Sequence, residues 1–134
     1  MSLFNLFNIS GSAVSAQSKR LNVVASNLAN ADSVAGPDGQ PYKARQISFQ
    51  AELAANGDTA GVRVGGITET AAPGRRVHEP AHPMADADGY VTHSNVNVVD
   101  EMVNMISASR AYQNNVEVMN TARQLLAKTL QMGQ

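Results

Sequence analysis

Residues 100–132, DEMVNMISASRAYQNNVEVMNTARQLLAKTLQM, run without a Gly or Pro, and apolar residues recur in them at alternating steps of three and four. The main row comprises Val99, Met102, Ile106, Ser109, Gln113, Val116, Asn120, Arg123, Ala127 and Leu130. A second row beside it comprises Met105, Tyr112, Met119 and Leu126. Because residues three and four apart share one face of a helix, the two rows predict one long helix with a broad apolar face. Asn97 and Asp100 are candidate caps for its start, and Gly133 suits its end.

The N-terminal 31 residues repeat this pattern. One row comprises Leu3, Phe7, Ser10, Val14, Gln17, Leu21, Val24, Leu28 and Ala31. The neighbouring row comprises Leu6, Ile9, Ala13, Ala16, Arg20, Val23 and Asn27. The spacing predicts a second helix over about residues 10–29.

The middle of the chain has a different composition, because all five prolines fall between positions 37 and 83. Proline interrupts helices, so short strands and turns are expected here. Alternation of apolar and polar residues predicts strands over residues 42–49 and 61–67, with weaker candidates at Val77 and at residues 90–91. We therefore divide the chain into an N-terminal helix (1–31), a small β-rich part (32–96) and a C-terminal helix (97–134). The fold class is mainly α with a small β-rich insert.

In both predicted helices, the hydrophobic pattern favours a buried helix while the intrinsic helix propensity of the residues is low. They are patterned for burial, yet Ser, Asn and β-branched residues are frequent in them, and each costs up to about 0.7 kcal/mol relative to Ala in a helix. We expect such helices to be largely unfolded alone and to need a partner surface. Two apolar rows per helix exceed what one partner helix covers, so the remaining rows call for other chains. Polar residues within the rows (Gln17, Asn27, Gln113 and Asn120) would then set the register by hydrogen bonds between helices.

Composition excludes several classes of function. The formal net charge is -1 and the sequence pI is about 6.3, so there is no electrostatic drive toward nucleic acid or anionic lipid. There is no cysteine, which excludes disulfides, thiolate metal sites and cysteine nucleophiles. We recognise no signal peptide and no membrane-spanning segment, and expect neither a nucleic acid nor a small-molecule substrate.

One stretch has the letters of a zinc-protease motif, His78-Glu79-Pro80-Ala81-His82. That chemistry requires a helix, which brings the two histidines to one face, and the internal proline prevents it. We interpret the stretch as a solvated loop. Asp86-Ala87-Asp88-Gly89 lacks the later ligands of a calcium loop and predicts a turn instead. We assign no catalytic, cofactor or metal site, and expect no enzyme activity.

Four segments carry a family resemblance. Ser26-Asn27-Leu28-Ala29-Asn30-Ala31-Asp32-Ser33 resembles a signature of bacterial flagellar axial proteins of the rod and hook class. The segments 36–45, 97–106 and 109–116 follow it in the order and spacing of that family. The resemblance implies that the terminal helices pair as a coiled-coil-like core, with the β-rich part projecting outward. It also implies helical assembly into a proximal rod that transmits torque, without enzyme activity.

The resemblance implies partners and a location as well. The partners are further copies of the chain, the rod proteins FlgB, FlgF and FlgG, the adaptor FliE, and the MS ring with its export gate. The location is the periplasmic rod of the basal body, reached by type III export without a cleaved signal peptide. The assembly interface expected from the rows and the resemblance comprises Leu21, Val24, Asn27, Leu28, Asn30, Val99, Met102, Ile106, Tyr112, Asn115, Val116 and Asn120. The alternatives are a helical adaptor that orders on docking and, more remotely, a metallohydrolase.

Overall fold

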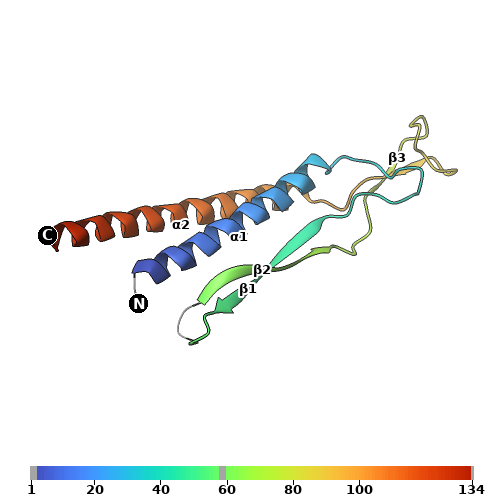
Figure 1. Ribbon diagram of the computed structural model, residues 1–134. Coiled ribbons are helices and arrows are strands. Elements are labelled where there is room, and N and C mark those ends of the chain that lie inside the picture. The colour runs from blue at the N-terminus through green and yellow to red at the C-terminus, as the bar shows by residue number, and fades with distance from the viewer. Residues whose placement is uncertain (1–2, 58–59, 134) are drawn as a thin grey trace. The chain divides into compact units, whose positions relative to one another are not determined.

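The computed structural model describes residues 3–57 and 60–133 of the chain. Its elements, in order, are α1 (Leu3–Ala29), β1 (Arg45–Leu53), β2 (Ala60–Glu69), β3 (Arg76–His78), β4 (Tyr90–Thr92) and α2 (Val98–Met132). Figure 1 shows the two long helices and, between them in the sequence, the short strands. The predicted fold class, mainly α with a small β insert, is confirmed.

The chain forms two compact units, and each takes parts of several elements. Within the described residues, the first unit holds the chain up to Leu21, Ile47–Gly66 and the chain from Ile106 onward. The second unit holds Asn22–Gln46 and Ile67–Met105. The division of the sequence at residues 31/32 and 96/97 is a different partition and stays a prediction.

Helix α1 begins at Leu3, so the predicted start near residue 10 is wrong. Leu6, Phe7 and Ile9 are half-buried, and Ser10 is 3% exposed. Packing of this apolar turn stabilises the helix where Asn5 and Asn8 lower its intrinsic propensity. The predicted end at Ala29 is confirmed.

Helix α2 begins at Val98 and is capped by Asn97, one of the two candidate residues. The Asn97 side-chain oxygen accepts the backbone N–H groups of Val99 (3.1 Å) and Asp100 (3.2 Å). At the other end, the Gly133 N–H donates to the Thr129 carbonyl after the helix ends at Met132. No helix within the described residues combines the length and the apolar character needed to cross a lipid bilayer.

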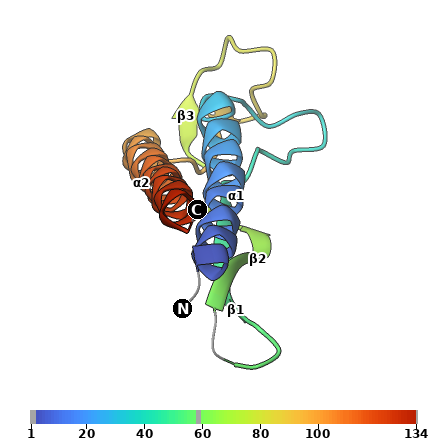
Figure 2. The same ribbon diagram turned by 60° about the vertical axis from the view of Figure 1, so that its left-hand side comes forward.

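Strands β1 and β2 form a two-stranded antiparallel sheet in place of the predicted strands 42–49 and 61–67. The first strand begins three residues later than expected; the N–H of Ala44, the residue before it, donates to the Asn95 side chain, and the N–H of Arg45, its first residue, donates to Asn27. Within the first unit, β2 lies against α1, and the Val62 N–H donates to the Ser12 hydroxyl at 2.9 Å. Gly61 permits this approach, since a Cβ there would lie 3.0 Å from that hydroxyl oxygen. Figure 2 shows the two strands beside the N-terminal half of α1.

Strands β3 and β4 pair antiparallel, with Val77 opposite Val91, and confirm the weaker predictions at these positions. A single bridge from Val34 to His93 extends the pairing. The connection between the strands ends in the predicted turn, where Gly89 adopts a φ of 82°, a conformation that glycine permits without strain.

Buried side chains are small or polar throughout the described chain. The buried apolar residues are Ala16, Val24, Ala31, Val91, Ala108 and Ala122, and the buried polar residues are Ser10, Asn27 and Ser94. The largest fully buried side chains are Val91 and Asn27. A core of this kind gives little hydrophobic stabilisation, so hydrogen bonds contribute a larger share of the stability than in an ordinary domain.

Candidate assembly interface

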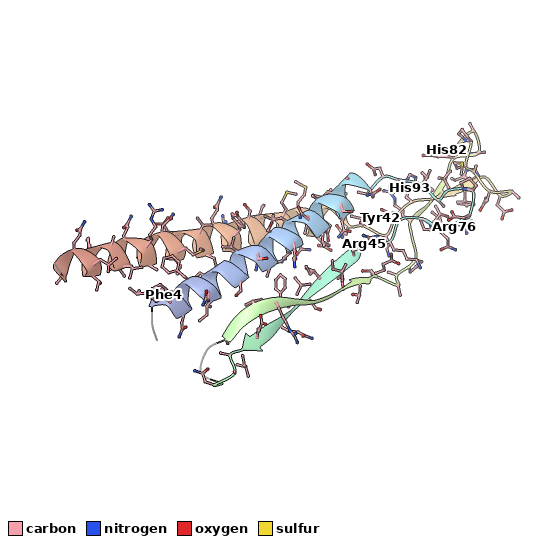
Figure 3. All side chains as sticks on the ribbon, in the orientation of Figure 1. Phe4, Tyr42, Arg45, Arg76, His82 and His93 are labelled. Atoms are coloured by element: carbon pink, nitrogen blue, oxygen red, sulfur yellow. The ribbon has the colours of Figure 1, made fainter. Side chains whose placement is uncertain are left out.

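Asn27, near the C-terminal end of α1, is the best-connected side chain of the second unit and is 1% exposed. Its amide nitrogen donates to the Arg45 carbonyl (2.9 Å) and to the Glu101 carboxylate (3.0 Å). Its amide oxygen accepts the Arg45 N–H (2.9 Å) and the Tyr42 hydroxyl (2.9 Å). Figure 3 shows Tyr42 and Arg45 close to this end of α1.

An asparagine side chain offers two donor hydrogens and one carbonyl oxygen with two lone pairs, and in Asn27 all four are used. Through them, one residue joins α1, the start of β1 and the first turn of α2. A buried amide with every hydrogen bond made fixes geometry, because any alternative packing leaves a buried polar group unpaired. We therefore call Asn27, Tyr42, Arg45 and Glu101 the Asn27 cluster.

Asn95 makes a second polar link within the same unit. Its amide nitrogen donates to the carbonyls of Thr70 (3.0 Å) and Ala72 (2.8 Å), and its oxygen accepts the Ala44 N–H (2.6 Å). The neighbouring Ser94 hydroxyl donates to the Ala31 carbonyl at 2.7 Å. These bonds hold the segments that enter and leave the strands beside the ends of the two helices.

The expected interface residues fall into three groups by exposure. Val24 and Asn27 are buried; Leu21, Leu28, Asn30, Tyr112, Asn115 and Val116 are half-buried; Val99, Met102, Ile106 and Asn120 are exposed. The side-chain amides of Asn30 and Asn115 donate to carbonyls four residues earlier in their own helices. The exposed group is the part that a neighbouring chain can reach in the described structure.

The first turns of α2 carry a run of exposed apolar side chains. Val99 is 69% exposed, Met102 54% and Val103 60%, and Val98 and Ile106 extend the same helix face. We call these five residues the α2 apolar face. Val103 belongs to it although the main apolar row does not include it, because the face is wider than one row. Exposed apolar surface of this kind marks a site of protein contact.

Two concave regions differ in charge. The basic groove, in the first unit, measures about 180 Å³ and is lined by Ser12, Ser15, Ala16, Lys19, Val62, Arg63 and Val64. The acidic cleft, in the second unit, measures about 470 Å³ and is lined by Ala44, Gln46, Thr70, Asn95, Asn97, Asp100, Glu101, Val103 and Asn104. The groove contains two cations and no carboxylate, and the cleft contains two carboxylates and no cation.

The loop that contains the sequence His78-Glu79-Pro80-Ala81-His82 is not helical, as expected. His78 ends β3, and the residues after it form turns in which the Nδ1 atom of His82 accepts the Met84 N–H at 3.0 Å. Figure 3 shows His82 and Arg76 at this loop. Among the residues that the structure describes, no three His, Asp or Glu side chains lie together in a way that would hold a metal ion.

Asp86 organises the β3–β4 connection instead. Its carboxylate accepts the N–H groups of Tyr90 (2.9 Å) and Asp88 (3.0 Å) and pairs with the Arg76 guanidinium at 3.0 Å. The hydrogen bond from the Tyr90 N–H has the largest effect and lowers the pKa of Asp86 below its usual value; desolvation, the next largest, opposes it, and the hydrogen bonds from Asp88 and Arg76 lower the pKa further. Arg76 also stacks on the Tyr90 ring, 4.7 Å from its centre.

Sequence reasoning missed several of the residues that hold these sites together. Ser12, Tyr42, Ser94 and Asn95 act through hydrogen bonds to segments 15 to 63 residues away. No periodicity marks such partners. The available signal was the position of Ser12 on an apolar helix and of Tyr42 in the segment that follows the family signature.

Comparison with known proteins agrees with this architecture of two terminal helices and a small insert. The family model described as "Flagella basal body rod protein" matches residues 7–37, and that described as "Flagellar basal body rod FlgEFG protein C-terminal" matches residues 87–132. Both matches include the helix ends that meet at the Asn27 cluster. The class of protein is therefore that of the flagellar rod.

Comparison with individual relatives assigns the chain to one family within the flagellar rod class. It is 59% identical over 134 residues to the flagellar basal-body rod protein FlgC of Salmonella typhimurium, covering all of both chains. It is 60% identical, again over the full length of both, to FlgC of Yersinia enterocolitica. With FlgC of Buchnera aphidicola subsp. Acyrthosiphon pisum it shares 48% identity over 97% of each chain. The chain belongs to the FlgC family of flagellar basal-body rod proteins, a family of structural proteins of the basal body.

Proposed function

We propose that this chain is a structural subunit of the proximal rod, which polymerises helically through its terminal helices and so transmits torque. The observation that carries the proposal is the α2 apolar face, which is exposed beside the fully satisfied Asn27 cluster. The cluster fixes the local backbone, and the apolar face it supports is left for neighbouring chains. Packed helices that are ordered by many neighbours form a stiff polymer, as a torque-bearing rod requires.

The proposed partners are further copies of the chain and other basal-body components, specifically FlgB, FlgF and FlgG, the adaptor FliE, and the MS ring with its export gate. The proposed location is the periplasmic part of the basal body, reached without a cleaved signal peptide. The twelve interface residues divide by role in this proposal. Val99, Met102 and Ile106 contact neighbours directly, while Asn27 and Asn30 hold the helix end that presents them.

The test replaces an exposed apolar residue by a charge in cells that lack their own copy of the protein. Ile106→Asp and Val99→Asp should abolish rod assembly and swimming, because each buries a carboxylate in an apolar contact. Gln124→Asp is the matched control, since Gln124 is an exposed polar residue of the same helix. Because all three positions are exposed, circular dichroism of the purified variants should match the unsubstituted chain.

Two outcomes would contradict the proposal. One is the assembly of complete rods by both apolar-to-charge variants. The other is a stable, defined small complex of the native chain with one partner, which would favour the adaptor alternative.

A further inference from the structure

The basic groove presents two long side chains without carboxylate partners. Lys19 on α1 and Arg63 on β2 are both exposed, and within the described residues neither makes an ion pair. Val62 and Val64, half-buried, and the buried Ala16 also line the groove; since successive side chains of a strand alternate, Arg63 lies on the other face of β2 from these two valines, at the rim of the groove. Residues 1–31 contain Lys19 and Arg20 and no acidic residue, so nothing on α1 neutralises the groove.

The acidic cleft has the opposite arrangement. Asp100 is exposed and lies in the first turn of α2, while Glu101 accepts hydrogen bonds from the neutral amides of Asn27 and Asn104. Neither carboxylate makes an ion pair in the described part of the chain. Val103 lines the cleft and also belongs to the α2 apolar face, so the cleft combines an apolar edge with an uncompensated negative charge.

We propose that the acidic cleft of one copy receives the Lys19–Arg63 groove of a second copy of the same chain. In this contact Lys19 enters the cleft beside Asp100 and Glu101, Val103 packs toward the apolar lining of the groove, and Arg63 adds positive charge at its rim. The inference rests on the proposed rod function and names the partner of its interface. Apolar contact supplies most of the affinity, whereas exposed ion pairs contribute little stability and chiefly fix orientation.

Charge and symmetry argue for a second copy as the occupant. Each chain carries both halves of the contact, a groove with two bases and an apolar lining and a cleft with two acids and an apolar edge. A contact between two different patches of identical chains is heterologous, and it continues as a ring or an open helix instead of closing as a dimer. That is the kind of contact that a helical polymer needs.

The first test exploits the absence of cysteine from the chain. Two full-length chains with single substitutions, Val103→Cys and Ser15→Cys, are co-expressed with different tags in cells that lack the native protein, and purified basal bodies are treated with a short bismaleimide. We expect a cross-linked product that carries both tags. A link within one chain is impossible, because each chain has one thiol. Asp38→Cys, in an exposed loop outside both surfaces, replaces Ser15→Cys in the control and should give no product.

The outcomes separate this inference from the rod function. Incorporation of both variants without the two-tag product, or a product that joins Val103→Cys to a different rod protein, overturns the inference and leaves the rod function standing. If Val103→Cys is not incorporated, Asp100→Cys reports on the same cleft. Absence of even the native chain from basal bodies would overturn the rod function itself.

Charge reversal gives a second test. Asp100→Lys alone, or Lys19→Glu with Arg63→Glu, should lower incorporation into basal bodies by about tenfold, because like charges then meet in the contact. The chain with all three substitutions should recover part of this loss, since the new lysine then faces the two new carboxylates while Glu101 keeps its negative charge. A triple variant no better than the worse partial variant would overturn the proposal. Glu117→Lys combined with Lys128→Glu, at exposed positions elsewhere on α2, is the matched control.

Discussion

The two compact units achieve order by different means. In the first unit the buried residues are Ser10, Ala16, Ala108 and Ala122, so its helices approach through small side chains while large apolar residues such as Phe4 and Leu130 stay exposed. In the second unit the fully buried side chains are Val91 and Asn27, and asparagine side chains bond backbone segments far apart in the sequence. The second unit is specified mainly by its own hydrogen bonds and the first by contacts between small side chains, while both leave apolar side chains exposed, such as Leu130 in the first and Val99 in the second.

This difference suits a subunit that orders on assembly. A hydrogen-bonded junction gives the free chain a defined local geometry, because its polar groups have no equally good alternative partners. Helices with exposed apolar faces and weak propensity remain responsive to neighbours. The contrast can be tested by perturbing each unit in turn.

The largest expected effect is on amide hydrogen exchange of the lone chain. The Arg45 amide, which donates to the buried Asn27, should exchange about a hundredfold more slowly than the amides of residues 117–130 in the last turns of α2. Exchange measured by NMR on the dilute, purified chain checks this. Equal protection of the two regions would remove the contrast between the units.

Asn27→Ala should be the most damaging single substitution in the second unit. It removes the four hydrogen bonds of this side chain, two to the Arg45 backbone and one each to Tyr42 and Glu101, at a total cost of roughly 3–4 kcal/mol in the free energy of unfolding. Urea unfolding followed by tyrosine fluorescence measures it. Asn120→Ala, at an exposed position, should change stability by less than about 0.5 kcal/mol; similar losses for both variants would refute the role of the Asn27 cluster.

Val91→Ala tests the apolar part of the same unit. Val91 is 1% exposed, so removal of two methyl groups and the resulting cavity should cost about 2 kcal/mol. Val118→Ala is the control in the first unit, where the valine is 40% exposed and its loss should be nearly neutral in the free chain. Urea midpoints of the two variants give the comparison, and a reversed order would show that the first unit holds the better-packed core.

Asn97→Ala should have a smaller effect. The substitution removes the side-chain acceptor for the first N–H groups of α2, which costs about 1 kcal/mol. Asn97→Asp keeps the acceptor and should retain stability. Thermal unfolding by circular dichroism separates the two, and equal midpoints for alanine and aspartate would show that the cap contributes nothing.

The smallest effect concerns pH and the β3–β4 connection. Because hydrogen bonds to the folded carboxylate lower the pKa of Asp86, its contribution to order is fully present above its usual pKa of about 3.8 and is lost as the pH falls through the folded value. The Tyr90 amide signal should therefore be constant from neutral pH to about pH 5 and shift only in stronger acid. Asp86→Asn should remove the transition; a Tyr90 shift that persists in this variant would assign it to another group.

Periodicity predicted both helices because a repeat of three and four residues is a local property of the chain. It placed the start of α1 seven residues late, because Asn5 and Asn8 lower the intrinsic helix propensity of the first turns. The helix forms there because Leu6, Phe7 and Ile9 pack against other parts of the unit. It also placed β1 three residues early; the amide of Ala44, just before the strand, bonds to the distant Asn95 side chain, which no local pattern indicates. The interface residues from Val99 to Ile106 were found as apolar helix positions, and whether they contact neighbours as predicted is what the assembly experiments measure.

From its sequence alone, this protein is fixed as two weak amphipathic helices around a proline-rich insert, and its signature segments place it among flagellar rod proteins. The spacing of apolar residues, the positions of the prolines and the net charge can be obtained from the sequence alone, because none of them depends on contacts between distant residues. Only the tertiary structure shows which polar groups form hydrogen bonds with one another. It shows that the Asn27 side chain makes all of its four hydrogen bonds within its own chain, and that acidic and basic residues line separate concave surfaces. Those outcomes depend on contacts between residues dozens of positions apart, which no local pattern encodes.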